Sequence, residues 1–99
     1  MDIVKVPGKN KVHKIFLYAL STCVWCKRTK KFLKDNDLAF EYIDVDLCSG
    51  EEVSKIKNDM LNRSSRIAYP MIIIDDKILI SGFPPYHVTL YFPLFAMMI

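Results

Sequence analysis

Cys23 and Cys26 stand two residues apart in the stretch STCVWCK, and cysteines with this spacing either hold a metal ion or exchange disulfides. A structural zinc ion needs four ligands, commonly from a second close pair of cysteines or histidines. The chain offers only Cys48, His13 and His87 besides the pair, each alone in the sequence. We therefore favour redox chemistry for Cys23 and Cys26, and a metal site built from scattered ligands is the alternative. For Cys48, packing as a small apolar side chain is the simpler interpretation.

The residues around the pair predict that it lies between a strand and a helix. Residues 15–20 are continuously apolar, which is typical of a strand covered on both faces. Ser21 and Thr22 offer N-cap hydroxyls, and helical spacing of apolar residues follows from Cys23 to Asp35. Unpaired N–H groups and the dipole at a helix N-terminus favour thiolate over thiol. We therefore expect Cys23 to be an exposed nucleophile and Cys26, one turn later, to be the resolving thiol.

The rest of the chain predicts a small α/β domain. A second strand is expected over residues 39–46, a second helix from Ser49 to about Arg63, and a hairpin formed by residues 71–74 and 78–80. The order β-α-β-α-β-β predicts a mixed four-stranded sheet flanked by helices. The basic residues 1–13 are predicted to form a loose arm.

Composition restricts the class of protein. Ninety-nine residues with 52% hydrophobic content form one domain, residues 1–99, and the net charge of +3 gives no reason to expect nucleic-acid binding. Three cysteines do not make the even-numbered disulfide framework of small secreted domains. The N-terminal residues lack the apolar run of an export signal. A cytoplasmic location is expected.

Three segments, LYALSTCVWCKRTKKFL, EYIDVDL and YPMIIIDDKILISGF, resemble glutaredoxins of the thioredoxin superfamily, over roughly residues 14–83. The resemblance implies a thioredoxin-like fold with a further C-terminal helix, and a dithiol oxidoreductase that uses Cys23 and Cys26. It also implies a cis peptide bond at Pro70, which would face the cysteines, and backbone groups of Tyr69 that pair with a substrate chain. No bound cofactor is implied. Electrons would come from glutathione or another low-molecular-weight thiol, or from a thioredoxin-type reductase.

The chain departs from the family where glutathione would bind. Leu20 occupies the position of a Lys or Arg, and Ser81-Gly82 followed by Phe83 replaces a Gly-Gly pair and an acidic residue. Each missing charged contact is worth about 1.5–3 kcal/mol, so glutathione would bind weakly. A sulfonated or carboxylated small thiol, or a disulfide-containing protein, is also compatible with the sequence. The predicted substrate-binding residues are Trp25, Lys27, Tyr69, Pro70, Ser81 and Gly82.

Lys27, Lys30, Lys31 and Lys34 recur at helical spacing and line one face of the predicted first helix. The simpler interpretation is a solvated face. The alternative is a positive field that favours the Cys23 thiolate and attracts an anionic thiol or an acidic protein.

The C-terminal tail, residues 84–99, is atypical, because no Asp, Glu, Lys or Arg follows Ser81. Prolines at 84, 85 and 93 argue against a membrane span. We expect a monomer, or a dimer formed through this tail. Two other functions stay open: a metal or iron–sulfur carrier that uses the same cysteines, as in some relatives of the family, and an interaction module that the cysteines switch.

Overall fold

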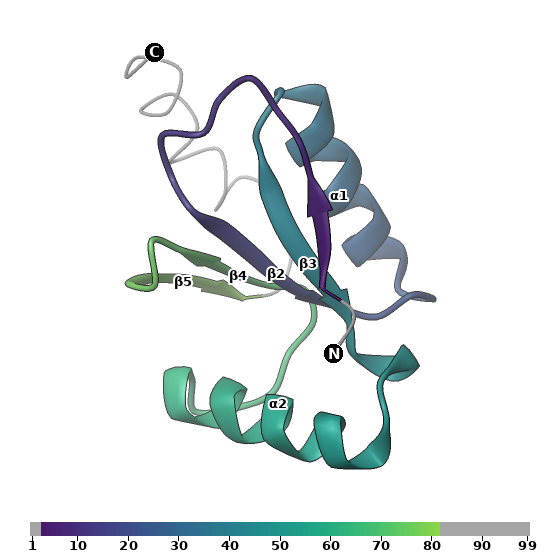
Figure 1. Cartoon of the computed structure of the whole chain (residues 1–99). Coiled ribbons are helices and arrows are strands. Elements are labelled where there is room, and N and C mark those ends of the chain that lie inside the picture. Colours follow the sequence, from purple (N-terminus) through teal and green to yellow (C-terminus); the bar gives the residue numbers. More distant parts are fainter. Residues whose placement is uncertain (1–2, 82–99) are drawn as a thin grey trace.

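The computed structural model, which describes residues 3–81, is built around a mixed sheet in the order β1-β3-β2-β4-β5 (Figure 1). The strands are β1 (Val4–Val6), β2 (Ile15–Ala19), β3 (Phe40–Asp44), β4 (Met71–Ile74) and β5 (Ile78–Ser81). Strand β2 runs parallel to β3, and every other neighbouring pair is antiparallel. The carboxyl ends of β2 and β3 therefore meet at one edge of the sheet.

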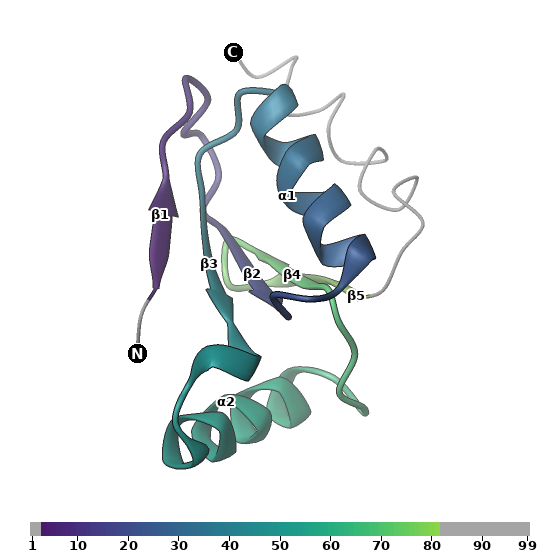
Figure 2. The same cartoon turned by 90° about the vertical axis from the view of Figure 1, so that its right-hand side faces the viewer.

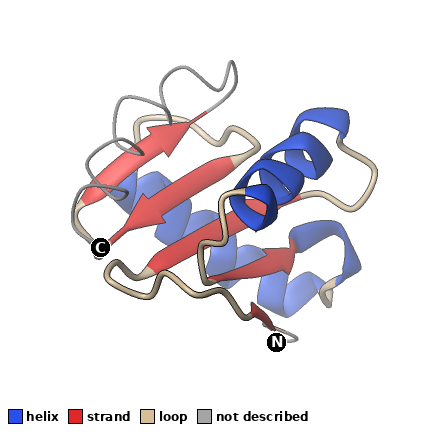
Figure 3. Ribbon diagram, turned by 90° about the horizontal axis from the view of Figure 1, so that it is seen from above, coloured by secondary structure: helices blue, strands red, loops and turns tan. Residues whose placement is uncertain are grey.

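Two helices cover opposite faces of this sheet (Figures 2 and 3). Helix α1 (Val24–Asp35) connects β2 to β3, as a parallel pair requires. Helix α2 (Gly50–Arg63) follows a short 3-10 turn, Val45–Leu47, and starts with a capping box between Ser49 and Glu52. The predicted second helix is confirmed.

Strand β2 is buried on both sides, as its continuous apolar run predicts. Leu17 and Ala19 are fully buried in the core on the α1 side, whereas Tyr18 belongs to the core on the α2 side, with Ile56 and Met60. The Tyr18 hydroxyl donates a hydrogen bond of 2.6 Å to the Asp59 carboxylate, so its buried polar atom has a partner.

The predicted number of strands is wrong, because the sheet has five strands and not four. The additional strand, β1, lies in the segment predicted as a loose arm and pairs antiparallel with β3. It is a three-residue edge strand with Lys5 at its centre, so it lacks the long apolar run of an interior strand. The predicted C-terminal helix, Gly82 and the tail of residues 84–99 lie outside the described residues.

Candidate active site

Cys23 lies between the carboxyl end of β2 and the first residue of α1. The predicted N-caps, Ser21 and Thr22, are wrong, because Cys23 itself is the N-cap residue and the helix begins at Val24. The backbone of Cys23 is extended, with φ −82° and ψ 119°, and its Sγ accepts a hydrogen bond of 3.3 Å from the Cys26 amide. A sulfur thus takes the position that a hydroxyl takes in most N-caps, at the positive end of the helix dipole.

Cys26 has a different environment from Cys23. It lies in the first turn of α1 and is fully buried in the α1-side core, whereas Cys23 is half-buried. Burial, and next the hydrogen bond with Cys23, raise the pKa of the Cys26 thiol to about 12. Cys26 therefore keeps its proton at neutral pH.

The loop before Cys23 is tied to the end of the neighbouring strand. Asp46, in the turn that follows β3, accepts a hydrogen bond of 2.8 Å from the Ser21 amide and a second one from the Ser21 hydroxyl. These bonds, with the hydroxyl first, hold the pKa of the Asp46 carboxyl below its usual value. The predicted second strand was too long at its C-terminal end, because the chain turns after Asp44 and presents Asp46 to this loop.

Tyr69 and Pro70 lie in the loop that precedes β4, and Tyr69 packs against the core cluster that contains Cys26. Their peptide bond is cis, as the resemblance implied, and Pro70 is fully buried. Tyr69 is half-buried and packs against the core clusters on both sides of the sheet. Burial, and next the proximity of Cys26 and Asp46, raise the pKa of the Tyr69 hydroxyl. Tyr69 is therefore close enough to Cys26 and Asp46 for their charges to affect its hydroxyl.

The residues between and just after the cysteines are exposed, and Val24, Trp25, Lys27 and Arg28 are called the exposed lip below. Val24 is 59% exposed and Trp25 is 47% exposed, so both side chains can be reached from solvent. The Arg28 guanidinium lies 4.8 Å from the centroid of the Trp25 ring, at cation–π distance. Lys27 is also exposed, and no described residue forms an ion pair with it.

The lysine face of α1 is not uniformly solvated, so the simpler interpretation of it is wrong for one member. Lys30 forms an ion pair of 2.8 Å with Asp44, and the two side chains are only 15% and 16% exposed. Its Nζ also lies 4.0 Å from the centroid of the Tyr42 ring. The pair with Asp44, at the end of β3, holds Lys30 inward, whereas Lys31 pairs with Asp35 on the helix surface.

Ser81 is the last residue of β5, and its backbone pairs with that of Met71, the residue after Pro70. The register therefore brings the backbone of residue 81 near Pro70, and its role in substrate binding stays a prediction. Gly82, the other residue predicted there, lies outside the described part of the chain.

The third cysteine does not join the pair. Cys48 is half-buried, packs against the α2-side core, and donates a weak hydrogen bond of 3.7 Å to the Asp44 carbonyl. Within residues 3–81, no group of three or more His, Cys, Asp or Glu side chains is arranged to hold a metal ion. In the same range, no helix has the length and apolar character needed to cross a membrane.

Sequence reasoning identified the two cysteines but missed Asp46 as a residue of the site. It assigned Asp44 and Asp46 to the end of the strand without naming their partners. The partner of Asp46 is Ser21, which is 25 residues earlier in the chain. Only the parallel pairing of β2 and β3 brings the two together.

Comparison with known proteins identifies the same fold and family. The Glutaredoxin family model matches residues 15–79. Glutaredoxin 1 of Rickettsia bellii is 31% identical over 69 residues, which are 70% of this chain and 69% of the relative. The crystal structure of a Methanosarcina mazei glutaredoxin superposes with a TM-score of 0.77 at 35% identity, covering 87% of this chain and 82% of that one.

Methanosarcina acetivorans methanoredoxin has a TM-score of 0.71 at 41% identity, covering 76% of this chain and 79% of that one. These matches confirm the predicted thioredoxin-like α/β class.

Proposed function

Because the chain belongs to the glutaredoxin family, we propose that it reduces disulfides through a dithiol mechanism in which Cys23 is the nucleophile and Cys26 the resolving thiol. The observation that carries this assignment is the asymmetry of the pair. Cys23 is accessible at the N-terminus of α1, whereas Cys26 is buried and has a pKa of about 12. Only the first is suited to meet a substrate.

The reaction has two exchange steps. The Cys23 thiolate attacks one sulfur of the substrate disulfide, forms a mixed disulfide with it, and releases the other sulfur, which takes up a proton as a thiol. Cys26 then loses its proton and attacks the Cys23 sulfur. The second substrate sulfur leaves and is protonated in turn. Two electrons have passed to the substrate, and the chain holds a Cys23–Cys26 disulfide that an external thiol must reduce.

The high pKa of Cys26 gives the steps their order. In the reduced protein, Cys26 stays protonated, and its backbone amide donates to the Cys23 sulfur. Once Cys23 has formed a mixed disulfide, its sulfur carries no charge. The hydrogen bond with Cys23, which helps to raise the pKa of Cys26, is then weakened. Resolution is thereby favoured after substrate capture and not before it.

The substrate would bind in the region formed by the exposed lip, Tyr69, Pro70 and the end of β5. The exposed cations Lys27 and Arg28 favour a substrate with an anionic group, such as glutathione or another acidic low-molecular-weight thiol. Leu20 offers no charge to a carboxylate, so we place glutathione and other small thiols on an equal footing. Disulfide-containing proteins are proposed as the other substrates, and the cytoplasm as the compartment.

Trapping tests this assignment. The Cys26→Ser variant, with Cys48→Ala in the same chain, is exposed to an oxidised extract of its own cells, and the intact mass is measured before and after dithiothreitol. The proposal predicts a reducible adduct on Cys23, whose mass identifies a small thiol or a protein. The matched control, Cys23→Ser with Cys48→Ala, should carry none. Equal adducts on both variants, or none on either, would contradict the assigned roles.

A further inference from the structure

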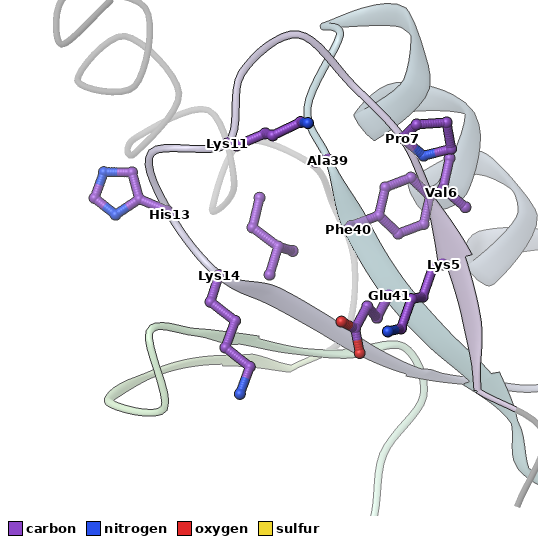
Figure 4. A pocket seen from close by; sticks show the side chains of 10 residues that line it. Lys5, Val6, Pro7, Lys11, His13, Lys14, Ala39, Phe40 and Glu41 are labelled. Atoms are coloured by element: carbon purple, nitrogen blue, oxygen red, sulfur yellow. The ribbon is translucent and has the colours of Figure 1, made fainter.

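A hollow of about 450 Å³ opens at the end of the sheet where β2 and β3 begin (Figure 4). It is bounded by β1, by the connection from β1 to β2, and by the first residues of β3. Cys23 follows the opposite end of β2, so a strand of about 3.3 Å per residue separates the hollow from the thiol site. The hollow is thus a separate feature, and its volume lies in the range typical of small-molecule pockets.

The connection that frames the hollow is held to the rest of the fold at both of its ends. At one end, Gly8 packs so closely on the chain before β3 that a Cβ there would lie 2.5 Å from the Ala39 nitrogen. The backbone of Asn10 donates a hydrogen bond of 2.9 Å to the Asp37 carbonyl and accepts one of 2.9 Å from the Ala39 amide. The Asn10 side chain is buried and accepts from the Val12 amide at 3.2 Å.

The other end is tied to the turn between β4 and β5. The Asp75 carboxylate accepts a hydrogen bond of 2.8 Å from the Lys14 amide and also bonds the His13 ring. The Asp75 amide in turn donates to the Lys14 carbonyl at 2.8 Å. Because both ends are fixed, the hollow exists before any ligand arrives, and a ligand would pay little of the ordering entropy of binding.

The lining combines an apolar floor with a basic rim. Phe40 and Ile15 are each 3% exposed and form the floor with Val6, Pro7 and Ala39. Three lysines stand on the rim, and Figure 4 shows Lys11 extending from the connection, with Lys14 at the start of β2 and Lys5 across from it on β1. An apolar floor under cations suits a molecule with a flat apolar body and an anionic group.

The charges of the rim leave an excess of positive charge. Lys5, Lys11 and Lys14 set against Glu41 give a formal sum of 3 − 1 = +2. Glu41 lies opposite Lys5 in the register of β1 and β3, so these two charges offset each other. Lys14 has an exposed contact of 3.7 Å with Asp76, whereas no described residue forms an ion pair with Lys11. Lys11 is therefore the cation most available to a ligand.

We propose that this hollow is a binding site for a small organic anion, whose apolar body lies against Val6, Pro7 and Ala39 and whose carboxylate or phosphate group pairs with Lys11, with Lys14 adding to the positive charge of the rim. The site is independent of the thiol chemistry. Its ligand is defined by two features together, the apolar body and the charge.

The experiment is a titration of the full ¹⁵N-labelled chain with 1-naphthyl phosphate, followed by amide chemical shifts. The amides of residues 5–7, 11–15 and 39–41 should shift in a saturable way. The double variant Lys11→Gln/Lys14→Gln should bind about tenfold or more weakly, a change of the size expected for lost charge-assisted contacts. Lys55→Gln, which removes an exposed lysine of α2, is the matched control and should bind as the unaltered chain does. Disulfide reduction should be unchanged in all three proteins.

Two related probes separate the features of the ligand. Neutral 1-naphthol tests the floor alone and inorganic phosphate tests the rim alone, and both should bind at least tenfold more weakly than 1-naphthyl phosphate. Equal binding of inorganic phosphate would mean diffuse attraction to surface lysines and would overturn the proposal. Shifts centred on Trp25 or Cys23, or no loss in the double variant, would overturn it as well.

Discussion

The two ends of β2 carry two different kinds of site. At its carboxyl end, the reactive groups are neighbours in the sequence, and one turn of helix is enough to set Cys23 beside Cys26. At its amino end, the hollow is assembled from three segments that span residues 5–41. Each end is nevertheless secured by one carboxylate, Asp46 at the thiol end and Asp75 at the other. The difference is that the first site is local and the second exists only in the folded chain.

The largest effect expected is at the thiol end. Cys23→Ser should lower the rate of disulfide reduction by about 10³-fold or more, because the only accessible nucleophile of the pair is lost. Cys48→Ser, the matched control, should keep nearly full activity, since Cys48 packs against the α2-side core. The rate is measured with a small-molecule disulfide under a fixed reductant. Comparable losses in the two variants would break the assignment of chemistry to the carboxyl end.

A smaller effect is expected from Gly8→Ala at the other end. The added Cβ would lie 2.5 Å from backbone atoms of Leu38 and Ala39, so the connection must shift away from β3. Overpacking of this kind destabilises by about 1–3 kcal/mol, which a urea titration would measure. Binding of 1-naphthyl phosphate should fall, while disulfide reduction at a temperature well below unfolding should be nearly unchanged. Loss of activity in the folded variant would show that the two ends are coupled.

Substitution of the two carboxylates, Asp46 and Asp75, should change activity and binding least, and it should show which end of β2 each carboxylate serves. Asp46→Asn weakens the hold on Ser21 and should slow disulfide reduction severalfold, whereas Asp75→Asn should leave that rate unchanged and weaken anion binding. The rate of disulfide reduction and the affinity for 1-naphthyl phosphate, measured for both variants, test this pattern. The reverse pattern, or a slower reduction in both variants, would contradict it.

Acid should loosen both ends together. A hydrogen bond from Ser21 holds the pKa of the Asp46 carboxyl below its usual value. A hydrogen bond with His13 does the same for the pKa of the Asp75 carboxyl. A carboxyl whose pKa is lowered in the folded state stabilises the fold above its unfolded pKa, and this contribution is lost as the pH falls through the folded pKa. Stability should therefore decline below about pH 4, and the decline should be shallower in the Asp46→Asn and Asp75→Asn variants. Urea midpoints across pH 2–6 provide the comparison.

Much of the fold could be predicted because its signals are local. The apolar run of β2, the capping residues of α2 and the β4–β5 hairpin each lie within a short window, and all three are confirmed. Strand β1 could not be predicted, because three residues with a central lysine carry little signal and only pairing with β3 makes them a strand. The N-cap was misassigned for a related reason, since the Ser21 hydroxyl serves Asp46 and leaves the cap to Cys23.

The two sites likewise differ in how far local sequence signals could predict them. The spacing of Cys23 and Cys26 was sufficient to predict a redox pair, and the structure adds the burial that distinguishes the two residues. Nothing in the sequence near Lys11 or Phe40 indicates a shared hollow, because the residues that line it are brought together by the closure of the connection on β3.

The central claim is that Cys23 and Cys26 differ in reactivity because one is accessible and the other is buried with its proton held. It is tested most directly by site-resolved alkylation of the reduced chain with iodoacetamide from pH 5 to 10, followed by mass spectrometry of peptides that separate the two cysteines. The account predicts that Cys23 is labelled faster than Cys26 at every pH of this range, because Cys23 is accessible whereas Cys26 is buried and burial raises its pKa to about 12. Labelling of Cys26 at a rate equal to or above that of Cys23 near pH 7 would contradict it.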